Sequence, residues 1–250
     1  MEKVYERSQT LKKNPTGYCP GCFHGVAMKI ICEIIDEMKM QDNTTTVLPI
    51  GCSSMGCFTI DTDMVIALHG RAPAVATGIK RCSPERLVYA YQGDGDLAAI
   101  GFSEIMYAAN RGENFTVIFV NNSIYGMTGG QMAPTTLVGQ KATTSQKGRN
   151  PENKEGYPMH MSELISQLKA PVYVERCALN SPQNILKAKK AIRKGFEIQL
   201  SGKGFSFIEL LSNCPTNWGM SPEETLKWME ENTMKEFPIG VYKDISEEVK

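Results

Sequence analysis

The stretch GDGD at positions 93–96 decides how the fold of this 250-residue chain is read. It follows the apolar run 86–92 (RLVYAYQ) and precedes a helix-like run at 97–111. A second apolar run, 115–120 (FTVIFV), then ends in the pair NN at 121–122. Strand, turn, helix and strand in this order predict a βαβ unit with a right-handed crossover. Because its two strands are parallel, we expect the acidic turn and the two asparagines at one edge of the sheet, where open α/β sheets bind ligands.

Other apolar runs extend this pattern. Strands are expected at 45–50, 64–68, 172–176 and 205–211, and apolar residues at helical spacing predict a helix over 24–39. Strands that alternate with helices, several of them apolar throughout, predict an α/β fold in which helices cover both faces of a parallel sheet.

Local signals mark two further helices and the domain limits. Ser181 and Pro182 begin a helix that should stop at Gly202, and Ser221 opens another with a capping box. We expect an N-terminal arm at 1–17, the α/β domain at 18–220, and a C-terminal helix and tail at 221–250.

Composition narrows the class of protein. The formal net charge is zero, with 42% hydrophobic and 22% charged residues, which is ordinary for a soluble globular chain and gives no sign of nucleic-acid binding. No apolar run approaches the ~18 residues of a membrane span. The first residues, MEKVYERSQTLKK, lack the apolar core of a signal peptide. A cytoplasmic protein without membrane association is therefore expected.

The chemistry of the GDGD turn points to a diphosphate held through Mg²⁺. Gly93 and Gly95 allow a sharp turn and a close approach to a ligand, and the amides that follow open a helix, whose N-terminus favours an anion. The carboxylate of Asp94, an asparagine amide oxygen and a backbone carbonyl are hard ligands that suit Mg²⁺. A GDG or NN pair alone is only a common turn signal, so the combination and its spacing carry the interpretation.

Several stretches of the sequence resemble a known family. GDG, 25 residues and then NN is similar to the thiamine-diphosphate signature. The stretches GDGDLAAIGFSE, NNSIYGMTGGQMAPTT and HGRAPAVATGIK (69–80) resemble the β subunits of 2-oxoacid:ferredoxin oxidoreductases, in particular the branched-chain (2-ketoisovalerate) type. The resemblance extends from Tyr18 to about Met229, and it implies the fold of a thiamine-diphosphate-binding (diphosphate) domain.

The resemblance also implies site residues. Asp94, Asn122 and the carbonyl of Ile124 would bind Mg²⁺, and His69 would be catalytic. The residues expected around the cofactor are Ile50, Gly51, Cys52, Ser53, His69, Thr77, Gly95, Asp96, Gly126 and Met127.

Four of the eight cysteines are candidates for a metal site. Cys19 and Cys22 form a CPGC motif, in which Pro-Gly turns both thiols toward one point. Cys52 and Cys214 follow two expected parallel strands, so both should lie at the edge that carries the GDGD turn. Four thiolates suit either zinc or a [4Fe–4S] cluster, and the resemblance favours the cluster. For the remaining cysteines packing is the expected role; these are Cys32, Cys57, Cys82 and Cys177.

The resemblance implies oxidative decarboxylation of a 2-oxoacid to acyl-CoA and CO₂, with electrons leaving through the cluster to ferredoxin. The glutamate that activates thiamine diphosphate in such enzymes belongs to a pyrimidine-binding domain, for which this sequence shows no second α/β half. We therefore expect a partner α subunit, together with γ and δ subunits. Glu104 is read as a solvated helix residue, His160 as structural, and His24 as either a cofactor contact or the start of a helix.

The substrate and the reaction type have alternatives. The loop 126–136 (GMTGGQMAPTT) has no Lys or Arg for a second carboxylate, which favours a branched-chain 2-oxoacid, with 2-oxoglutarate or pyruvate as alternatives. Two other functions stay open: a non-redox thiamine-diphosphate decarboxylase, and a zinc-stapled α/β binding module without catalysis.

Overall fold

The computed structural model describes residues 5–249 and places a seven-stranded sheet at the centre of that part of the chain. The first four residues of the expected arm and the last residue of the expected tail lie outside the described residues. Neighbouring strands follow the order β2-β1-β3-β4-β6-β5-β7. In chain order the strands are β1 (Thr44–Leu48), β2 (Asp63–Ile66), β3 (Leu87–Gly93), β4 (Thr116–Asn121), β5 (Tyr173–Ala178), β6 (Ser206–Leu211) and β7 (Gly240–Asp244).

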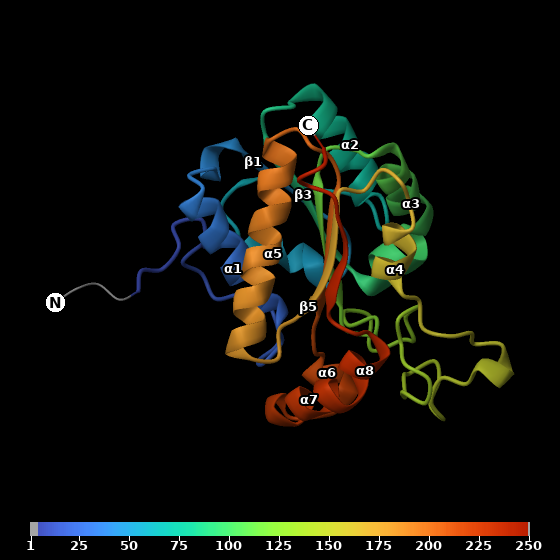
Figure 1. The fold of residues 1–250 in the computed structure, drawn as a ribbon. Coiled ribbons are helices and arrows are strands. Elements are labelled where there is room, and N and C mark those ends of the chain that lie inside the picture. The colour runs from blue at the N-terminus through green and yellow to red at the C-terminus, as the bar shows by residue number, and fades with distance from the viewer. Residues whose placement is uncertain (1–4, 250) are drawn as a thin grey trace.

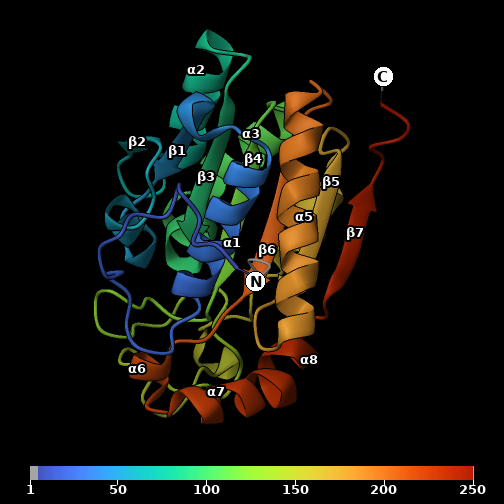
Figure 2. The same ribbon diagram turned by 90° about the vertical axis from the view of Figure 1, so that its left-hand side faces the viewer.

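Strands β1 to β6 are parallel, as the sequence predicts, and β3 and β4 are neighbours with Gly93 opposite Val120. The seventh strand was not foreseen. It lies in the C-terminal tail and pairs with β5 in the antiparallel direction, with a register shift between Val174 and Glu175. Figure 2 shows β7 at one edge of the sheet and β2 at the other.

Helices cover both faces of the sheet. They are α1 (His24–Glu37), α2 (Ala72–Cys82), α3 (Phe102–Arg111), α4 (Met161–Ser166), α5 (Pro182–Leu200), α6 (Pro215–Trp218), α7 (Pro222–Trp228) and α8 (Met234–Glu236). Helices α1 and α5 lie on one face, and α2, α3 and α4 lie on the other (Figure 1). Because side chains alternate along a strand, Tyr89 and Tyr91 of β3 pack under α1 and α5, whereas Val88 and Ala90 pack under α2 and α3.

The predicted starts of the helices at Ser181 and Ser221 are confirmed. The hydroxyl of Ser181 accepts a hydrogen bond from the amide of Asn184 at the start of α5. Ser221 and Glu224 form the expected capping box at the start of α7. At both helix starts a nearby side chain accepts a hydrogen bond from a backbone amide that the helix itself leaves unpaired.

The helix expected at 97–111 is interrupted. A π-helical turn, Gly95–Ile100, comes directly after β3, and α3 begins only after Gly101. Gly101 stands at the break, and no side chain fits there because its Cβ would lie 2.6 Å from the carbonyl oxygen of Gly70. Two backbones therefore cross here, and α2, which sequence reasoning did not find, follows directly after the crossing loop.

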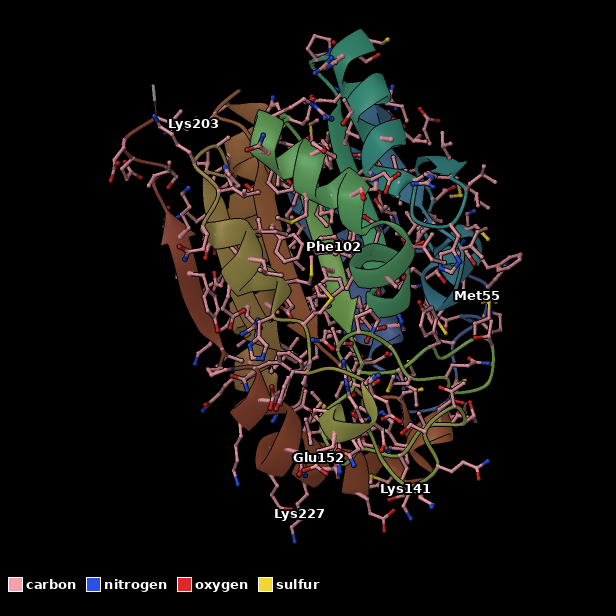
Figure 3. All side chains as sticks on the ribbon, turned by 90° about the vertical axis from the view of Figure 1, so that its right-hand side faces the viewer. Met55, Phe102, Lys141, Glu152, Lys203 and Lys227 are labelled. Atoms are coloured by element: carbon pink, nitrogen blue, oxygen red, sulfur yellow. The ribbon has the colours of Figure 1, made fainter. Side chains whose placement is uncertain are left out.

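A long irregular segment, 122–160, lies at the carboxyl ends of the parallel strands. Figure 3 shows Lys141 and Glu152 of this segment at the same end of the molecule as Lys227 of α7, with Lys203 at the opposite end. The buried guanidinium of Arg149 ties the segment together by donating hydrogen bonds to five backbone carbonyls; these belong to Pro134, Thr136, Glu155, Gly156 and Tyr157.

The described part of the arm is attached to the domain. Leu11 forms an isolated antiparallel bridge with Ile60, and the carboxylate of Asp36 on α1 accepts hydrogen bonds from the backbone amides of Gln9 and Thr10. Across residues 5–249, no helix has the length and apolarity needed to cross a bilayer.

Candidate active site

A pocket of about 110 Å³ opens at the carboxyl ends of β1, β3 and β4. Most of the residues predicted to contact the cofactor or Mg²⁺ line it; they are Ile50, Gly51, Cys52, Ser53, His69, Asp94, Gly95, Asp96, Asn122, Gly126 and Met127. His24, Tyr125 and Thr128 also line it. Parallel strands bring these distant segments together because each segment directly follows a strand.

Asp94 is the central acid of the pocket and is almost completely buried. One carboxylate oxygen accepts a hydrogen bond from the amide of Gly95 at 2.8 Å, and the other accepts one from the hydroxyl of Thr135 at 2.7 Å. Burial raises the pKa of Asp94 to about 6, although these hydrogen bonds oppose the shift. A buried carboxylate of this kind is a suitable ligand for a divalent cation, whose charge offsets the cost of burial.

The two asparagines have different tasks. Asn122 lines the pocket, and its amide oxygen accepts a hydrogen bond from the amide of Ile124 at 3.3 Å. Asn121 points into the protein, where its amide nitrogen donates to the buried carboxylate of Glu209 at 2.8 Å. Among the described residues, none donates a hydrogen bond to the carbonyl of Ile124. Asp94, Asn122 and this carbonyl thus offer the oxygen donors that suit Mg²⁺.

Asp96 anchors the loop that carries His69. Its carboxylate accepts hydrogen bonds from the amide of Gly70 at 2.7 Å and the side-chain amide of Gln92 at 2.5 Å. Nε2 of His69 lies 3.4 Å from the same carboxylate. Burial raises the pKa of Asp96. The side chain of Asp96 therefore serves this loop, and its backbone amide is the group left for an anion.

Tyr125 was not singled out from the sequence, although it closes one side of the site. Its hydroxyl donates to the carbonyl of Gly95 at 3.0 Å. A Cβ at Gly95 would lie 2.2 Å from the tyrosine ring, so this position requires glycine. The turn after β3 and the turn after β4 are thus in direct contact.

Ser53 and Thr77 differ in how they relate to the pocket. The hydroxyl of Ser53 is buried beside the pocket without a hydrogen-bond partner among the described residues, as expected of a group that meets a ligand. Thr77 lies within α2, where its hydroxyl donates to the carbonyl of Pro73, and it does not line the pocket. Its contact with a cofactor stays a prediction.

His24 lies in the pocket as well as at the start of α1. It is almost completely buried, its Nδ1 lies 2.6 Å from the hydroxyl of Tyr91, and its ring stacks on Tyr18. Burial lowers the pKa of His24 to about 4, so the imidazole is neutral at neutral pH.

Two of the four predicted thiols, those of Cys52 and Cys214, lie next to the pocket at Gly126. A Cβ at Gly126 would lie 3.0 Å from the sulfur of Cys52 and 3.7 Å from that of Cys214. Burial, with a smaller contribution from the neighbouring thiols, raises the pKa of Cys22 to about 12 and that of Cys52 to about 11. The thiol of Cys22 is thus affected by the other three predicted thiols, and that of Cys52 by Cys19 and Cys214.

An iron–sulfur cluster takes four thiolates, so these cysteines stay the predicted ligands of such a cluster. Within residues 5–249, no three His, Cys, Asp or Glu side chains are close enough together to hold one metal ion. Of the cysteines expected to have a packing role, Cys32 and Cys177 are buried and donate to the carbonyl of Thr10 and the carboxylate of Glu175, and Cys57 is half-buried. The expectation is wrong for Cys82, which is exposed at the end of α2.

Glu104 and His160 form ion pairs or hydrogen bonds outside the pocket. Glu104 forms an ion pair with Arg71. His160 contacts the carboxylates of Glu163 and Glu236. Neither lines the pocket.

Comparison with known proteins agrees with the geometry of this site. Residues 49–210 match the family model "Thiamine pyrophosphate enzyme, C-terminal TPP binding domain". The chain is 47% identical to ketoisovalerate oxidoreductase subunit VorA of Methanothermobacter marburgensis, over 99% of this chain and 52% of that protein. It is 37% identical to 2-oxoglutarate synthase subunit KorB of Methanocaldococcus jannaschii, over 94% of this chain and 83% of that one.

A solved structure shares the fold. The 2-oxoglutarate:ferredoxin oxidoreductase from Magnetococcus marinus, with 2-oxoglutarate, coenzyme A and succinyl-CoA bound, superimposes with a TM-score of 0.77 at 24% identity, over 97% of this chain and 86% of that one. The chain therefore belongs to the thiamine pyrophosphate enzymes, among the thiamine-diphosphate-binding subunits of 2-oxoacid oxidoreductases. It spans about half the length of the ketoisovalerate oxidoreductase subunits that it matches.

Proposed function

We propose that this chain is the subunit of a 2-oxoacid:ferredoxin oxidoreductase that binds thiamine diphosphate, Mg²⁺ and a [4Fe–4S] cluster. The complete enzyme would convert a 2-oxoacid and coenzyme A to acyl-CoA and CO₂ and pass electrons singly to ferredoxin. The observation that carries this proposal is the contact at Gly126, where the diphosphate pocket and the sulfurs of Cys52 and Cys214 meet within 4 Å of one backbone position.

Different residues of this chain would hold each cofactor. Asp94, Asn122 and the carbonyl of Ile124 would hold Mg²⁺, and the amides at Gly95 and Asp96 would hold the diphosphate. Thiamine diphosphate, once bound, supplies the electron sink that lets a 2-oxoacid lose CO₂. The thiols of Cys19, Cys22, Cys52 and Cys214 would hold the cluster.

Two histidines line the pocket, His24 with a neutral imidazole and His69. The hydroxyl of Tyr91 holds Nδ1 of His24, which leaves Nε2 for a polar group of the ligand. Because the imidazole is neutral, it would orient this group without adding a charge to the pocket. His69 is positioned by Asp96 at the mouth of the pocket, where we assign it to proton handling on the substrate side.

A partner subunit completes the site. The pocket is smaller than the ~300–1,000 Å³ of a complete small-molecule site. Exposed apolar side chains surround it: Ile50 and Met127 line it, Leu68 next to His69 is 78% exposed, and Ile100 packs against Gly70. Such a rim is typical of a protein interface. We assign it to the α subunit that carries the pyrimidine-binding domain, with γ and δ subunits completing the enzyme.

The preferred substrate in this proposal is 2-ketoisovalerate. The rim residues Ile50 and Met127 are apolar, and the loop 126–136 offers no cation for a second carboxylate. The two relatives named for ketoisovalerate are 47% identical to this chain, and five named for 2-oxoglutarate are 32–38% identical. Steady-state kinetics of the assembled enzyme with 2-ketoisovalerate, 2-oxoglutarate and pyruvate decides among the three.

Two substitutions test the cofactor assignments separately. Asp94→Ala should abolish Mg²⁺-dependent binding of thiamine diphosphate while iron content and fold are retained. Cys214→Ala should lose cluster iron while thiamine diphosphate still binds. Full iron content in Cys214→Ala would move the fourth ligand to another residue, with Cys57 as the first candidate.

The rival function is a non-redox decarboxylase, which would need the thiamine site and no cluster. Anaerobically purified protein should be brown, with absorbance near ~400 nm from the iron–sulfur cluster. Colourless, iron-free protein that binds thiamine diphosphate would support the rival. Binding of zinc without thiamine diphosphate, even with the partner subunit present, would support the binding module instead.

A further inference from the structure

Asn217 lies between the sulfur site and the diphosphate loop. It is in the short helix α6, which begins immediately after Cys214. Its side-chain nitrogen lies 3.2 Å from the sulfur of Cys214 and 3.0 Å from the carbonyl oxygen of Gly126. One amide group therefore contacts both a thiol assigned to the cluster and the loop assigned to the diphosphate.

The orientation of this amide is fixed by its surroundings. The carbonyl of Gly126 can only accept a hydrogen bond, so the nitrogen of Asn217 must face it. The amide oxygen points to the other side, where a Cβ at Gly130 would lie 3.0 Å from it. Both protons of the amide nitrogen are consequently used, one toward Gly126 and one toward the sulfur of Cys214.

We propose that Asn217 is a positioning residue that couples the two cofactor sites: it donates a hydrogen bond to a cluster thiolate and fixes Gly126 beside it. This rests on the proposed function. Hydrogen bonds to the sulfurs of an iron–sulfur cluster are among the determinants of its reduction potential, and partners of metal ligands hold those ligands in place. A donor at a ligand sulfur stabilises the reduced, more negative cluster, so Asn217 raises the potential at which the cluster accepts one electron.

Two variants separate this role from plain packing. Asn217→Asp has nearly the same shape and replaces the donor with a negatively charged acceptor. Asn217→Leu removes the polar group altogether. Thr216→Val is the matched control, because Thr216 is exposed on the same helix and, among the described residues, makes no side-chain hydrogen bond to Cys214 or Gly126.

The experiment is a one-electron redox titration of the full chain, reconstituted anaerobically with iron and sulfide and followed by electron paramagnetic resonance. At a fixed solution potential, Asn217→Leu should raise the ratio of oxidised to reduced cluster about tenfold, which for one electron is ~59 mV. Asn217→Asp should raise it further, and Thr216→Val should match the unmodified chain. Thiamine diphosphate should bind several-fold more weakly to both Asn217 variants, because Gly126 has lost its donor.

The outcomes are distinguishable. If the unmodified chain forms a cluster and both Asn217 variants keep its potential, the inference is wrong and the proposed function stands. If the potential shifts and thiamine diphosphate affinity does not, the coupling to Gly126 is wrong. If the unmodified chain forms no cluster, the cluster assignment and this inference fail together.

Discussion

The carboxylate of Glu209 is the centre of a buried network beneath the turn that carries Asn121. Glu209 lies on β6 and is completely buried. It accepts hydrogen bonds from Asn121 at 2.8 Å and from the hydroxyl of Ser162 at 2.5 Å, and Nε of Arg176 lies 2.9 Å from it. We predict that removing this carboxylate destabilises the whole domain and loosens the turn 121–124, which would carry Mg²⁺ ligands in the proposed function.

The magnitude follows from what each variant leaves unpaired. Breaking one side of a buried ion pair costs about 3–5 kcal/mol, and because Arg176 keeps its second partner, Glu163, we expect the lower end. Glu209→Gln still offers Asn121 an acceptor, so its loss should be about 3 kcal/mol. Glu209→Leu also leaves the Asn121 amide without an acceptor, which adds about 1–3 kcal/mol. At roughly 2–4 °C per kcal/mol for a chain of this size, Glu209→Gln should melt about 6–12 °C lower.

The assay is equilibrium unfolding of the full chain by urea and by heat. Glu197→Gln on α5 is the control, since that glutamate is exposed and its substitution should change stability by less than about 0.5 kcal/mol. The double variant Arg176→Met with Glu209→Leu should recover much of the loss, because a buried ion pair replaced by apolar side chains is often neutral.

The functional readout is the affinity for Mg²⁺ and thiamine diphosphate, measured where each variant is still folded. Glu209→Leu should bind more weakly than Glu209→Gln, because only the glutamine still holds Asn121 next to Asn122. If the free energy of unfolding of Glu209→Leu lies within about 1 kcal/mol of that of the unmodified chain, the buried network does not stabilise the domain and the prediction is wrong.

Three further predictions follow from single positions. Gly95→Ala should weaken Mg²⁺-dependent thiamine diphosphate binding at least ~tenfold by calorimetry, because the new Cβ overlaps the ring of Tyr125 and the turn must shift. Gly78→Ala on α2 should instead raise the free energy of unfolding by about 0.5–1 kcal/mol, since no atom lies near the added methyl group; a loss would contradict the packing of α2. The hydrogen bond to Glu163, together with Glu236, raises the pKa of His160 above its ordinary value of 6.5, so its stabilising contribution is complete below pH 6.5 and is lost as the pH rises through the folded-state pKa; urea unfolding from pH 6 to 9 should show this decline, and His160→Gln should remove it.

The parallel sheet could be predicted from the sequence because its inner strands are buried on both faces. Runs such as 115–120 are apolar at every position except Thr116, and only a strand covered on both faces needs so many apolar residues in a row. Helix α5 was predicted with its correct bounds, since Ser181 and Pro182 act locally. Strand β7 escaped prediction because it is a short edge strand with mixed polarity, and its pairing with β5 depends on contacts more than 60 residues away.

The same distinction explains the site. Asp94 and Asn122 could be predicted as site residues because each comes directly after a strand. Tyr125, Thr135 and Asn217 act across 30, 41 and 91 residues of chain respectively, and no local pattern encodes such contacts.

The buried charge of Asp94 links stability to cofactor binding. Among the described residues, no Lys, Arg or His forms an ion pair with this carboxylate, and its burial raises its pKa to about 6. The ionised form of Asp94 is therefore less stable in the folded chain than it would be in water, and a bound cation would offset that cost. In the proposed function Mg²⁺ would supply that charge, and the diphosphate would be the anion that the following helical turn favours. Each ligand would then lower the electrostatic cost of binding the other, so we expect Mg²⁺ and thiamine diphosphate to bind together and to stabilise the fold by mass action.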